Sequence, residues 1–285
     1  MCVSITNDET KLSWNKAEAN LRHFRTLADV STKSNTNSLG IRGRYVSGSG
    51  QFTLKNIYLL TEKVKQVAGS VEKIIIVDVR KESHGFVNGL PVDWKVKNSD
   101  ANKDKSHAEI LKDEKEKLQK LFQNKIIDEV VVETVCTEEE FALENGFGYV
   151  RLPTLDHSHP NDETVDAFIN LIKKNPNAWL HIHCHVGKGR TTSFMVLYDI
   201  FYNCKELKLE EILNRHKEID GQDFEKHLSK TDLDQRKRDL FDNRLNFLKN
   251  FYRYCKESDS QTITWQTWLQ EEKSKLLLPG NPQTV

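Results

Sequence analysis

The chain has 285 residues, which is long enough to bury a substantial core in one large domain. Lys and Arg together number 42, and so do Asp and Glu, so the formal net charge is zero. This balance argues against a nucleic-acid binder that works through bulk positive charge. No apolar run approaches the roughly 20 residues of a membrane span, and residues 1–9 show no secretory signal pattern. We therefore expect a cytoplasmic protein by default, with a removed leader or another secretion route left open, and the five cysteines as free thiols.

The first half of the chain contains clear strand and helix patterns. Residues 73–79 form a continuous apolar run with β-branched side chains, which is typical of a strand buried on both faces. Ser106 and Glu109 form a capping-box pattern that predicts the start of a charged helix. Its inner side is expected to consist of Ile110, Leu111, Leu118, Leu121 and Phe122. Further strands are predicted over residues 128–135 and 148–152.

An amphipathic helix is predicted next, because apolar residues recur with the helical period. These residues are Val165, Phe168, Ile169 and Ile172. Asn161 or Asp162 would begin the helix, and residues 175–177 would end it. Residues 177–183 then predict a buried strand, and residues 191–198 predict a buried helix.

The rest of the chain is expected to be helical. One helix is predicted over about 207–219 and a longer one over about 241–255, while Trp265 and Trp268 are expected to pack onto the core rather than bind a ligand. Strands that alternate with helices predict an α/β fold with a mainly parallel central sheet. No repeat, low-complexity block or linker divides the chain, so a single domain is expected.

The most informative segment is 183–191, which lies between the predicted strand and helix. It contains Cys184, and Arg190 follows six positions later. A helix N-terminus offers unpaired N–H groups and a positive dipole end, which favour an anion. A thiol in the same place is expected to ionise readily, and the planar fork of an arginine matches two oxygens of a phosphoryl group. The segment therefore predicts a cysteine nucleophile in a phosphate-binding loop.

Other residues fit the same chemistry. Gly187 and Gly189 supply the backbone dihedrals that a loop curled around a phosphate needs, and Thr191 can place a hydroxyl near the sulfur. Expulsion of an alkoxide needs an acid to protonate the leaving oxygen. Asp156, on the loop before the amphipathic helix, is the candidate. Alone it would be interpreted as a turn residue, but the Cys184 loop favours the catalytic role.

Three other interpretations of the loop are weaker. An inert buried cysteine would need no arginine and glycines at these spacings. A Walker-type nucleotide loop requires Ser or Thr after Gly-Lys, whereas Gly189 follows Lys188. The alternating histidines of residues 181–185 make a zinc site conceivable, but ligands spaced in this way along one strand lie in a row rather than around a tetrahedron. We expect no metal and no other cofactor.

The Cys-x5-Arg loop resembles that of the protein tyrosine phosphatase superfamily. More narrowly, the chain resembles the bacterial tyrosine-phosphatase-like inositol polyphosphate phosphatases, also called cysteine phytases. The matching segments lie at 151–157, 178–184 and 189–195, with further matches at 23–26, 47–52, 78–85 and 251–254. The match is patchy but extends from about residue 20 to about residue 270. It implies a tyrosine-phosphatase-like core flanked by helices, with a small partial β-barrel from inserted segments.

The resemblance also implies a domain organisation and a set of roles. We expect one phosphatase domain over 1–285, with an N-terminal extension of about 1–50 and an insertion of about 85–127. Cys184 would form a phosphocysteine, and Arg190 would clamp the phosphoryl oxygens. Asp156 would act first as general acid and then as general base.

Further residues are implied to support catalysis or to contact the substrate. His157 lies beside the acid, and Arg25 matches an N-terminal arginine that reaches the substrate in relatives. The loop residues implied to bind substrate are His185, Val186, Gly187, Lys188 and Gly189. The family also uses cations from its insertion and its C-terminal helices. For this substrate-binding role we name Lys237 as the candidate, with Lys125 and Arg244 as alternatives.

The chain departs from the family pattern in two places. His159 precedes Pro160 where relatives have tryptophan, a difference that bears on the packing and closure of the acid loop. His185 and Lys188 replace an acidic and an apolar residue, so the floor of the loop is more basic. This predicts a preference for highly phosphorylated rings over a single phosphotyrosine.

We therefore expect metal-independent hydrolysis of inositol polyphosphates such as phytate through a phosphocysteine intermediate. The alternatives are a phosphoinositide-lipid or dual-specificity protein phosphatase, or a non-catalytic inositol-phosphate binding module. A membrane lipid is the less favoured substrate, because no basic amphipathic helix is evident. The expected partner is a small-molecule substrate and no nucleic acid, and the sequence makes no prediction of oligomeric state.

Overall fold

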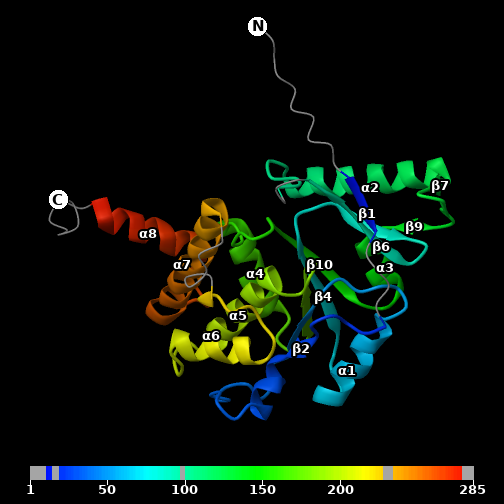
Figure 1. Ribbon diagram of the computed structural model, residues 1–285. Coiled ribbons are helices and arrows are strands. Elements are labelled where there is room, and N and C mark those ends of the chain that lie inside the picture. The colour runs from blue at the N-terminus through cyan, green and yellow to red at the C-terminus, as the bar shows by residue number, and fades with distance from the viewer. Residues whose placement is uncertain (1–10, 15–18, 97–99, 227–233, 278–285) are drawn as a thin grey trace, which may run out of the picture.

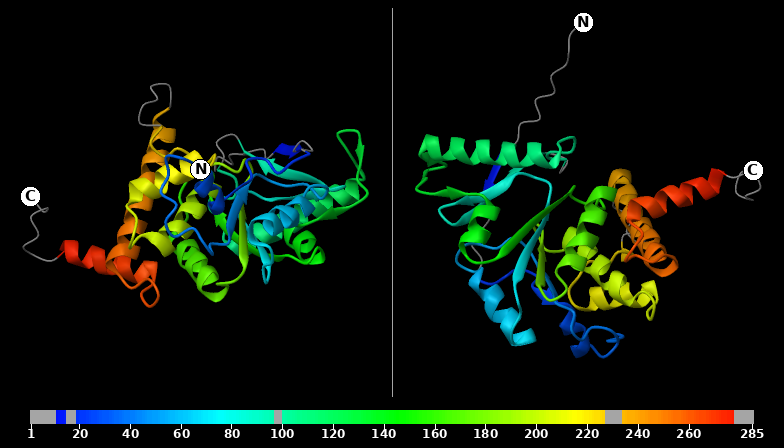
Figure 2. Two further views of the ribbon diagram at one scale, coloured as in Figure 1. Left: turned by 90° about the horizontal axis from the view of Figure 1, so that it is seen from below. Right: turned by 180° about the vertical axis from the view of Figure 1, so that it is seen from behind.

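A five-stranded sheet lies between two groups of helices (Figure 1; Figure 2). The structure is a computed structural model that describes residues 11–14, 19–96, 100–226 and 234–277, so the N-terminal segment assessed for a secretory signal lies outside the described residues. The strand order is β10-β4-β11-β3-β2. The strands are β2 (Arg25–Thr26), β3 (Val46–Ser49), β4 (Ile74–Arg80), β10 (Gly148–Thr154) and β11 (Trp179–His183). Only β2 is antiparallel to its neighbour, which confirms the expected α/β fold with a mainly parallel sheet.

Strand β4 shows why both faces of this sheet are covered. Successive side chains of a strand point to opposite faces. Ile74 and Ile76 therefore pack on the side of α1 (Tyr58–Ala68) and α3 (Glu138–Glu144). Ile75, Val77 and Val79 pack on the other side, among side chains of the C-terminal helices. The continuous apolar run in the sequence reflects this double burial.

Five helices gather on the second side of the sheet in Figure 1, where the first two contact its strands and the other three pack mainly on these two. They are α4 (Asp162–Lys174), α5 (Gly189–Asn203), α6 (Leu209–Glu218), α7 (Gln235–Glu257) and α8 (Trp265–Leu277). Asn161 caps α4 by accepting a hydrogen bond from the Thr164 N–H, as its position predicts. Trp265 and Trp268 are buried and pack against aromatic side chains of α7, so their predicted core role is confirmed.

A second, antiparallel sheet has the order β1-β6-β5-β9 and packs against α2 (His107–Asn124). Its strands are β1 (Lys11–Trp14), β5 (His84–Val87), β6 (Leu90–Lys95) and β9 (Val135–Cys136). The Ser106 hydroxyl accepts from the Glu109 N–H at the start of α2, which confirms the predicted capping box. The sheet is open, with β1 and β9 at its edges, so the partial barrel remains a prediction.

Two details differ from the predictions of helices and strands. The strand expected over 128–135 is interrupted, because Asp128 and Glu129 have φ angles of 47° and 66°, which lie outside the β region. They form the turn of a short hairpin made of β7 (Ile126–Ile127) and β8 (Val130–Val131). Phe122 was expected on the inner side of α2, but it is 50% exposed.

The expected N-terminal extension also differs. The 3-10 helix η1 (Leu27–Thr32) connects β2 to β3, and both strands belong to the central sheet. Residues 25–49 are therefore part of the core rather than an addition to it. The segment expected as an insertion, 85–127, contributes most of β5, all of β6 and the helix α2 that covers them.

Candidate active site

The predicted phosphate loop connects β11 to α5 at the carboxyl edge of the central sheet. Ligands of parallel α/β sheets usually bind at this edge. Gly187 has a φ of 89°, and a Cβ there would lie 2.3 Å from the backbone nitrogen of Gly50, just after β3. Only glycine combines this left-handed conformation with such a close approach. The loop is thereby held against the end of β3.

Cys184 lies at the bottom of the loop and is 3% exposed. The Gly187 N–H donates to Sγ over 3.2 Å, and the Thr191 hydroxyl oxygen also lies 3.2 Å from Sγ. Helix α5 begins at Gly189, so its first N–H groups and the positive end of its dipole face the loop. These donors are placed to stabilise a thiolate and to bind an anion above it.

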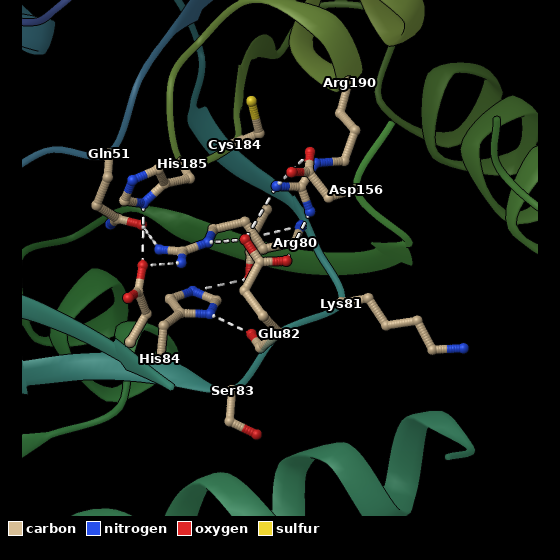
Figure 3. A network of polar contacts seen from close by, with 12 residues as sticks. Gln51, Arg80, Lys81, Glu82, Ser83, His84, Asp156, Cys184, His185 and Arg190 are labelled. Atoms are coloured by element: carbon tan, nitrogen blue, oxygen red, sulfur yellow. Dashed lines mark hydrogen bonds and ion pairs between the residues drawn. The ribbon is translucent and has the colours of Figure 1, made fainter. Parts of the chain in front are cut away.

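Arg190 is held as a fork by Glu82 (Figure 3). Its Nη1 donates to Glu82 Oε2 over 2.6 Å, and its Nη2 donates to Oε1 over 2.9 Å. Burial acts to raise the pKa of Glu82, but Arg190 and Arg80 outweigh it and hold this pKa well below its ordinary value. Arg190 Nε is buried and has no hydrogen-bond partner among the described residues. One donor of the guanidinium thus remains available.

Glu82 was not singled out from the sequence. It lies within residues 78–85, a segment that carried the family resemblance without an assigned role. Its partner Arg190 is 108 positions away, so no local spacing signal connects them.

Asp156 and His157 follow β10 and lie over the loop. Asp156 Oδ1 is 3.2 Å from Arg190 Nη2, and His157 Nε2 is 3.5 Å from Asp156 Oδ2. Burial acts to raise the pKa of Asp156, but the positive charge of Arg190, and then His157, lower it below its ordinary value. Burial lowers the pKa of His157. In the free protein Asp156 is therefore a carboxylate.

Two ring contacts with α7 help to hold this acid loop. The imidazole of His159 stacks on the ring of Phe247 with centroids 4.9 Å apart and an interplanar angle of 10°. The ring of His157 meets Phe241 edge-on with centroids 6.0 Å apart. His159 thus packs its planar ring against this helix.

Arg25 lies behind the loop rather than in front of it. Its Nη1 donates to the carbonyl of Gly187 over 2.8 Å, and its Nη2 donates to the hydroxyl of Thr192 over 2.8 Å. Burial lowers the pKa of Arg25 to about 10, so it stays a cation. In this structure Arg25 supports the backbone of the loop, and its contact with a substrate remains a prediction.

The loop and the acid face a cavity of about 300 Å³. Eight predicted site residues line it: Asp156, His157, Cys184, His185, Val186, Lys188, Gly189 and Arg190. Arg25, Gly187 and Thr191 are not among the lining residues: Gly187 and Thr191 contact Cys184 Sγ, and Arg25 supports the Gly187 carbonyl. Lys237 is not among the residues that line the cavity, and its Nζ lies 3.6 Å from Asp234. Lys125 ends α2 and is likewise absent from the lining.

Arg244 of α7 lines the cavity, and it was one of three open candidates. Its Nε and Nη2 donate to the carbonyl of Ser158 over 3.3 and 3.0 Å, and no carboxylate of the described chain lies within ion-pair distance. Burial lowers the pKa of Arg244 to about 10, so it remains charged near neutral pH. A Cβ at Gly189 would lie 2.8 Å from Arg244 Nη1, so glycine lets the guanidinium approach the loop.

The arrangement of nucleophile, arginine fork and overhanging acid is that of a cysteine-dependent phosphatase. A sequence model of a family described as PTP-like phytase, inositol hexakisphosphate, matches residues 130–202. The PTP-like phytase of Bdellovibrio bacteriovorus superposes with a TM-score of 0.76 and 32% identity, over 92% of this chain and 95% of that chain. The chain belongs to the PTP-like phytase family.

Two further relatives are longer than this chain. The PTP-like myo-inositol phosphatase of Mitsuokella multacida, solved in complex with myo-inositol-(1,3,4,5)-tetrakisphosphate, superposes with a TM-score of 0.80 and 30% identity over 90% of this chain and 48% of that chain. Effector protein hopD2 of Pseudomonas syringae pv. tomato is 27% identical over 232 residues, which cover 73% of this chain and 48% of the effector. The chain thus spans about half the length of each.

Cellular location is less constrained than family membership. No helix of the described residues is long and apolar enough to cross a membrane. The cytoplasmic location expected from the sequence stays a prediction, because one protein similar to this chain is named an effector protein.

A buried ionic network lies behind the phosphate loop. Asp78, Glu138 and His183 offer ligand atoms within 4.8 Å of one another, so they were considered as a metal site. However, His84 Nε2 lies 3.2 Å from Asp78 Oδ2 and 3.3 Å from Glu138 Oε2. Burial and Arg80 act to lower the pKa of His84, but the carboxylates raise it to about 10, which makes it an imidazolium. A cation already occupies the place between the two acids.

The three alternating histidines do not converge on one point. His181 contacts the hydroxyls of Ser47 and Ser49 at 2.9 and 3.0 Å. His183 Nε2 lies 2.5 Å from Glu138, and His185 faces a different acid. This geometry does not fit the zinc site considered from the sequence.

Proposed function

We propose that this protein is a metal-independent phosphatase that hydrolyses inositol polyphosphates, such as phytate, through a phosphocysteine intermediate. The observation that carries the proposal is the convergence of Cys184, Arg190 and Asp156 on one cavity. The likeness to a Mitsuokella multacida enzyme that binds an inositol tetrakisphosphate supports the substrate class.

The first chemical step forms the phosphocysteine. The Cys184 thiolate attacks phosphorus, the S–P bond forms as the ester P–O bond breaks, and Asp156 gives its proton to the leaving oxygen. Asp156 is ionised in the free protein because Arg190 lies 3.2 Å away. A phosphoryl dianion competes for Arg190 and adds negative charge nearby, and both effects favour the protonated acid.

The second step releases phosphate. The Asp156 carboxylate takes a proton from a water, the water oxygen attacks phosphorus, and the S–P bond breaks to return the thiolate. Arg190, whose Nε is free, and the first N–H groups of α5 stabilise the charge of both transition states. These groups supply the charge stabilisation that a metal supplies in other phosphatases.

The cations around the cavity favour a polyphosphate over a single phosphotyrosine. Arg244 lines the cavity as a buried cation without a carboxylate partner. A second phosphate group of the substrate could supply the negative charge that this buried cation lacks. Lys188 pairs with Asp220, which also contacts His23 Nδ1 at 2.7 Å. This pair is only partly buried, so an additional phosphate can compete with Asp220 for the ammonium group.

The substrate class is tested by phosphate release. Inositol hexakisphosphate, a short-chain phosphoinositide and a phosphotyrosine peptide are compared at equal concentration, with and without EDTA. We expect the hexakisphosphate to react fastest and EDTA to have no effect. Equal or faster turnover of the peptide or the lipid would favour the corresponding alternative, and loss of activity in EDTA would contradict metal independence.

The nucleophile is tested by Cys184→Ser, which should bind inositol hexakisphosphate but release no phosphate. Cys204→Ser is the matched control, because Cys204 is a buried cysteine at the end of α5 and does not line the cavity. Phosphate release by Cys184→Ser would overturn the mechanism. Phosphate release by the unchanged protein, with binding but no release by Cys184→Ser, would exclude a non-catalytic binding module.

A further inference from the structure

His185 follows the nucleophile and stands between the cavity and a buried acid. Its Nδ1 lies 3.0 Å from Oδ2 of Asp93, a fully buried residue of β6 in the second sheet. The His185 carbonyl accepts from the Gln51 N–H over 3.2 Å and from the Arg22 side chain over 2.5 Å, so the backbone at this residue is fixed. The imidazole lines the cavity, and no hydrogen bond within the described chain reaches its Nε2. That nitrogen is free for a ligand.

Asp93 belongs to a network of ion pairs that includes Arg80, Glu82, Arg190 and Asp156, which are labelled in Figure 3. Arg80 Nη2 donates to Asp93 over 2.7 Å, and Arg80 Nε donates to Glu82 over 2.8 Å. Glu82 in turn holds Arg190, which contacts Asp156. Two guanidinium groups and the ammonium group of Lys95, whose Nζ lies 3.7 Å from Asp93 Oδ1, therefore face these three carboxylates.

The free protein keeps His185 neutral. Burial lowers the pKa of His185, and Asp93 only partly opposes it. The charged groups that face the imidazole are Asp93 and Lys95 from β6, Arg80 from β4, Arg22 beside the carbonyl, and the adjacent Cys184. A phosphate ester in the cavity would add negative charge beside the ring, which favours the imidazolium.

Resting on the proposed function, we propose that His185 binds a substrate phosphate as an imidazolium that forms only when the anionic substrate enters, and that Asp93 is the positioning residue that holds it. The proton comes from solvent and returns to solvent when the product leaves. Substrate binding therefore takes up one proton at His185, separate from the proton that Asp156 needs for catalysis.

Proton uptake can be measured directly. Calorimetric titration of Cys184→Ser near neutral pH, in buffers with different ionisation enthalpies, gives the number of protons taken up per ligand. The probe is myo-inositol hexasulfate, because its sulfate esters do not titrate in this range and every proton must go to the protein. We expect Cys184→Ser to take up more than Cys184→Ser/His185→Gln, by up to about one proton. Equal uptake would overturn the inference.

His107→Gln in the same Cys184→Ser background is the matched control, because His107 is exposed at the start of α2 and does not line the cavity. This control should keep the full uptake. His157→Gln should keep the part of the uptake that depends on His185, because His157 contacts Asp156 whereas His185 contacts Asp93. Loss of that part in either variant would contradict the assignment to His185.

Two further variants test the mechanism of the effect. With His185→Lys, a permanent cation, hexasulfate binding should depend less on pH, whereas Cys184→Ser alone should lose up to about tenfold in affinity for each pH unit above the pKa of the bound imidazole. Asp93→Asn, checked for folding by its thermal melting, should abolish the His185-dependent proton uptake, although the imidazole of His185 remains. Retention of that proton would contradict the role of Asp93.

The readouts separate this inference from the proposed function. Hexasulfate binding requires no hydrolysis, so a protein that fails to release phosphate from inositol hexakisphosphate yet shows the His185-dependent uptake would disprove only the proposed function. A protein that hydrolyses the hexakisphosphate without that uptake would disprove only the inference.

Discussion

Asp156 experiences two opposed effects on its carboxyl group. Burial raises its pKa, whereas Arg190 and His157 lower it, and the net result lies below the ordinary value. A general acid must carry a proton before it can give one away. The same arginine that binds the phosphoryl group therefore keeps the acid ionised until the substrate arrives. At the scale of single residues, the protonation state of Asp156 therefore depends on whether Asp156 or the substrate phosphoryl group contacts Arg190.

This competition predicts the pH dependence of the reaction. Because the pKa of Asp156 is lowered, the protonated fraction of the free enzyme falls about tenfold per pH unit above that pKa. We expect kcat/KM for inositol hexakisphosphate to fall as pH rises toward neutrality. Asp156→Asn should remove this dependence and lower kcat by about 10²–10⁴-fold.

An activated aryl phosphate supplies the internal comparison, because its leaving group needs little protonation. Asp156→Asn should slow the aryl phosphate far less than the hexakisphosphate. Asp239→Asn, on an exposed residue of α7, should leave both rates unchanged. Equal losses on both substrates in Asp156→Asn would assign the acid to another residue.

At the scale of elements, the unit formed by β11, the phosphate loop and α5 depends on contact with β3. Gly187 has a positive φ and leaves no room for a Cβ against the backbone of Ser49 and Gly50. Arg25 then holds the Gly187 carbonyl from behind over 2.8 Å. The shape of the anion site is thus set by the strand beside the loop as well as by the loop.

Gly187→Ala tests this contact against a matched control. Gly43 also has a positive φ, of 71°, but a Cβ there meets nothing within 4 Å. Gly43→Ala should lower the free energy of unfolding by about 1–2 kcal/mol, because alanine is strained in the left-handed conformation. It should keep activity. Gly187→Ala should lower Tm further and lose phosphate release. Equal shifts of Tm in the two variants would show that the contact with β3 carries no energy.

At the scale of the whole molecule, two buried histidines make the stability depend on pH in opposite directions. Burial lowers the pKa of His181 to about 3, so it stays neutral between its two serines. The carboxylates around His84 raise its pKa to about 10 against the effect of burial. One histidine therefore resists gaining a proton, and the other resists losing it.

The sign of each contribution follows from linkage. Below about pH 6.5 the unfolded chain protonates His181 while the folded protein does not, so stability should fall with decreasing pH by up to about 1.4 kcal/mol per unit. The contribution of His84 is complete below about pH 6.5 and is lost as pH rises toward the folded pKa of about 10. Thermal melting should therefore show a maximum Tm near neutral pH.

Variants separate the two limbs of this melting profile. His181→Gln should flatten the slope between about pH 4.5 and 6.5, and His84→Gln should flatten the alkaline slope. His159→Gln, outside both networks, should keep both slopes. An unchanged acid slope in His181→Gln would assign that slope to other groups.

How much was predictable depends on the sequence distance between interacting groups. The spacing from Cys184 to Arg190, the capping box at Ser106 and the alternate burial of β4 were all visible, because each depends on neighbours within a few positions. The contact of Arg25 with the Gly187 carbonyl behind the loop was not expected from the sequence. Its position depends on how β2 pairs with β3, and no local pattern encodes that pairing.

By itself, the sequence determined that a cysteine and an arginine share one anion-binding turn at the start of a helix, because this geometry is local. Only the tertiary structure decided the charge states within the site. Glu82 reaches Arg190, and Asp93 reaches His185, from remote strands and their ends. Charge states depend on burial and on the distance between charges, and folding sets both of these quantities.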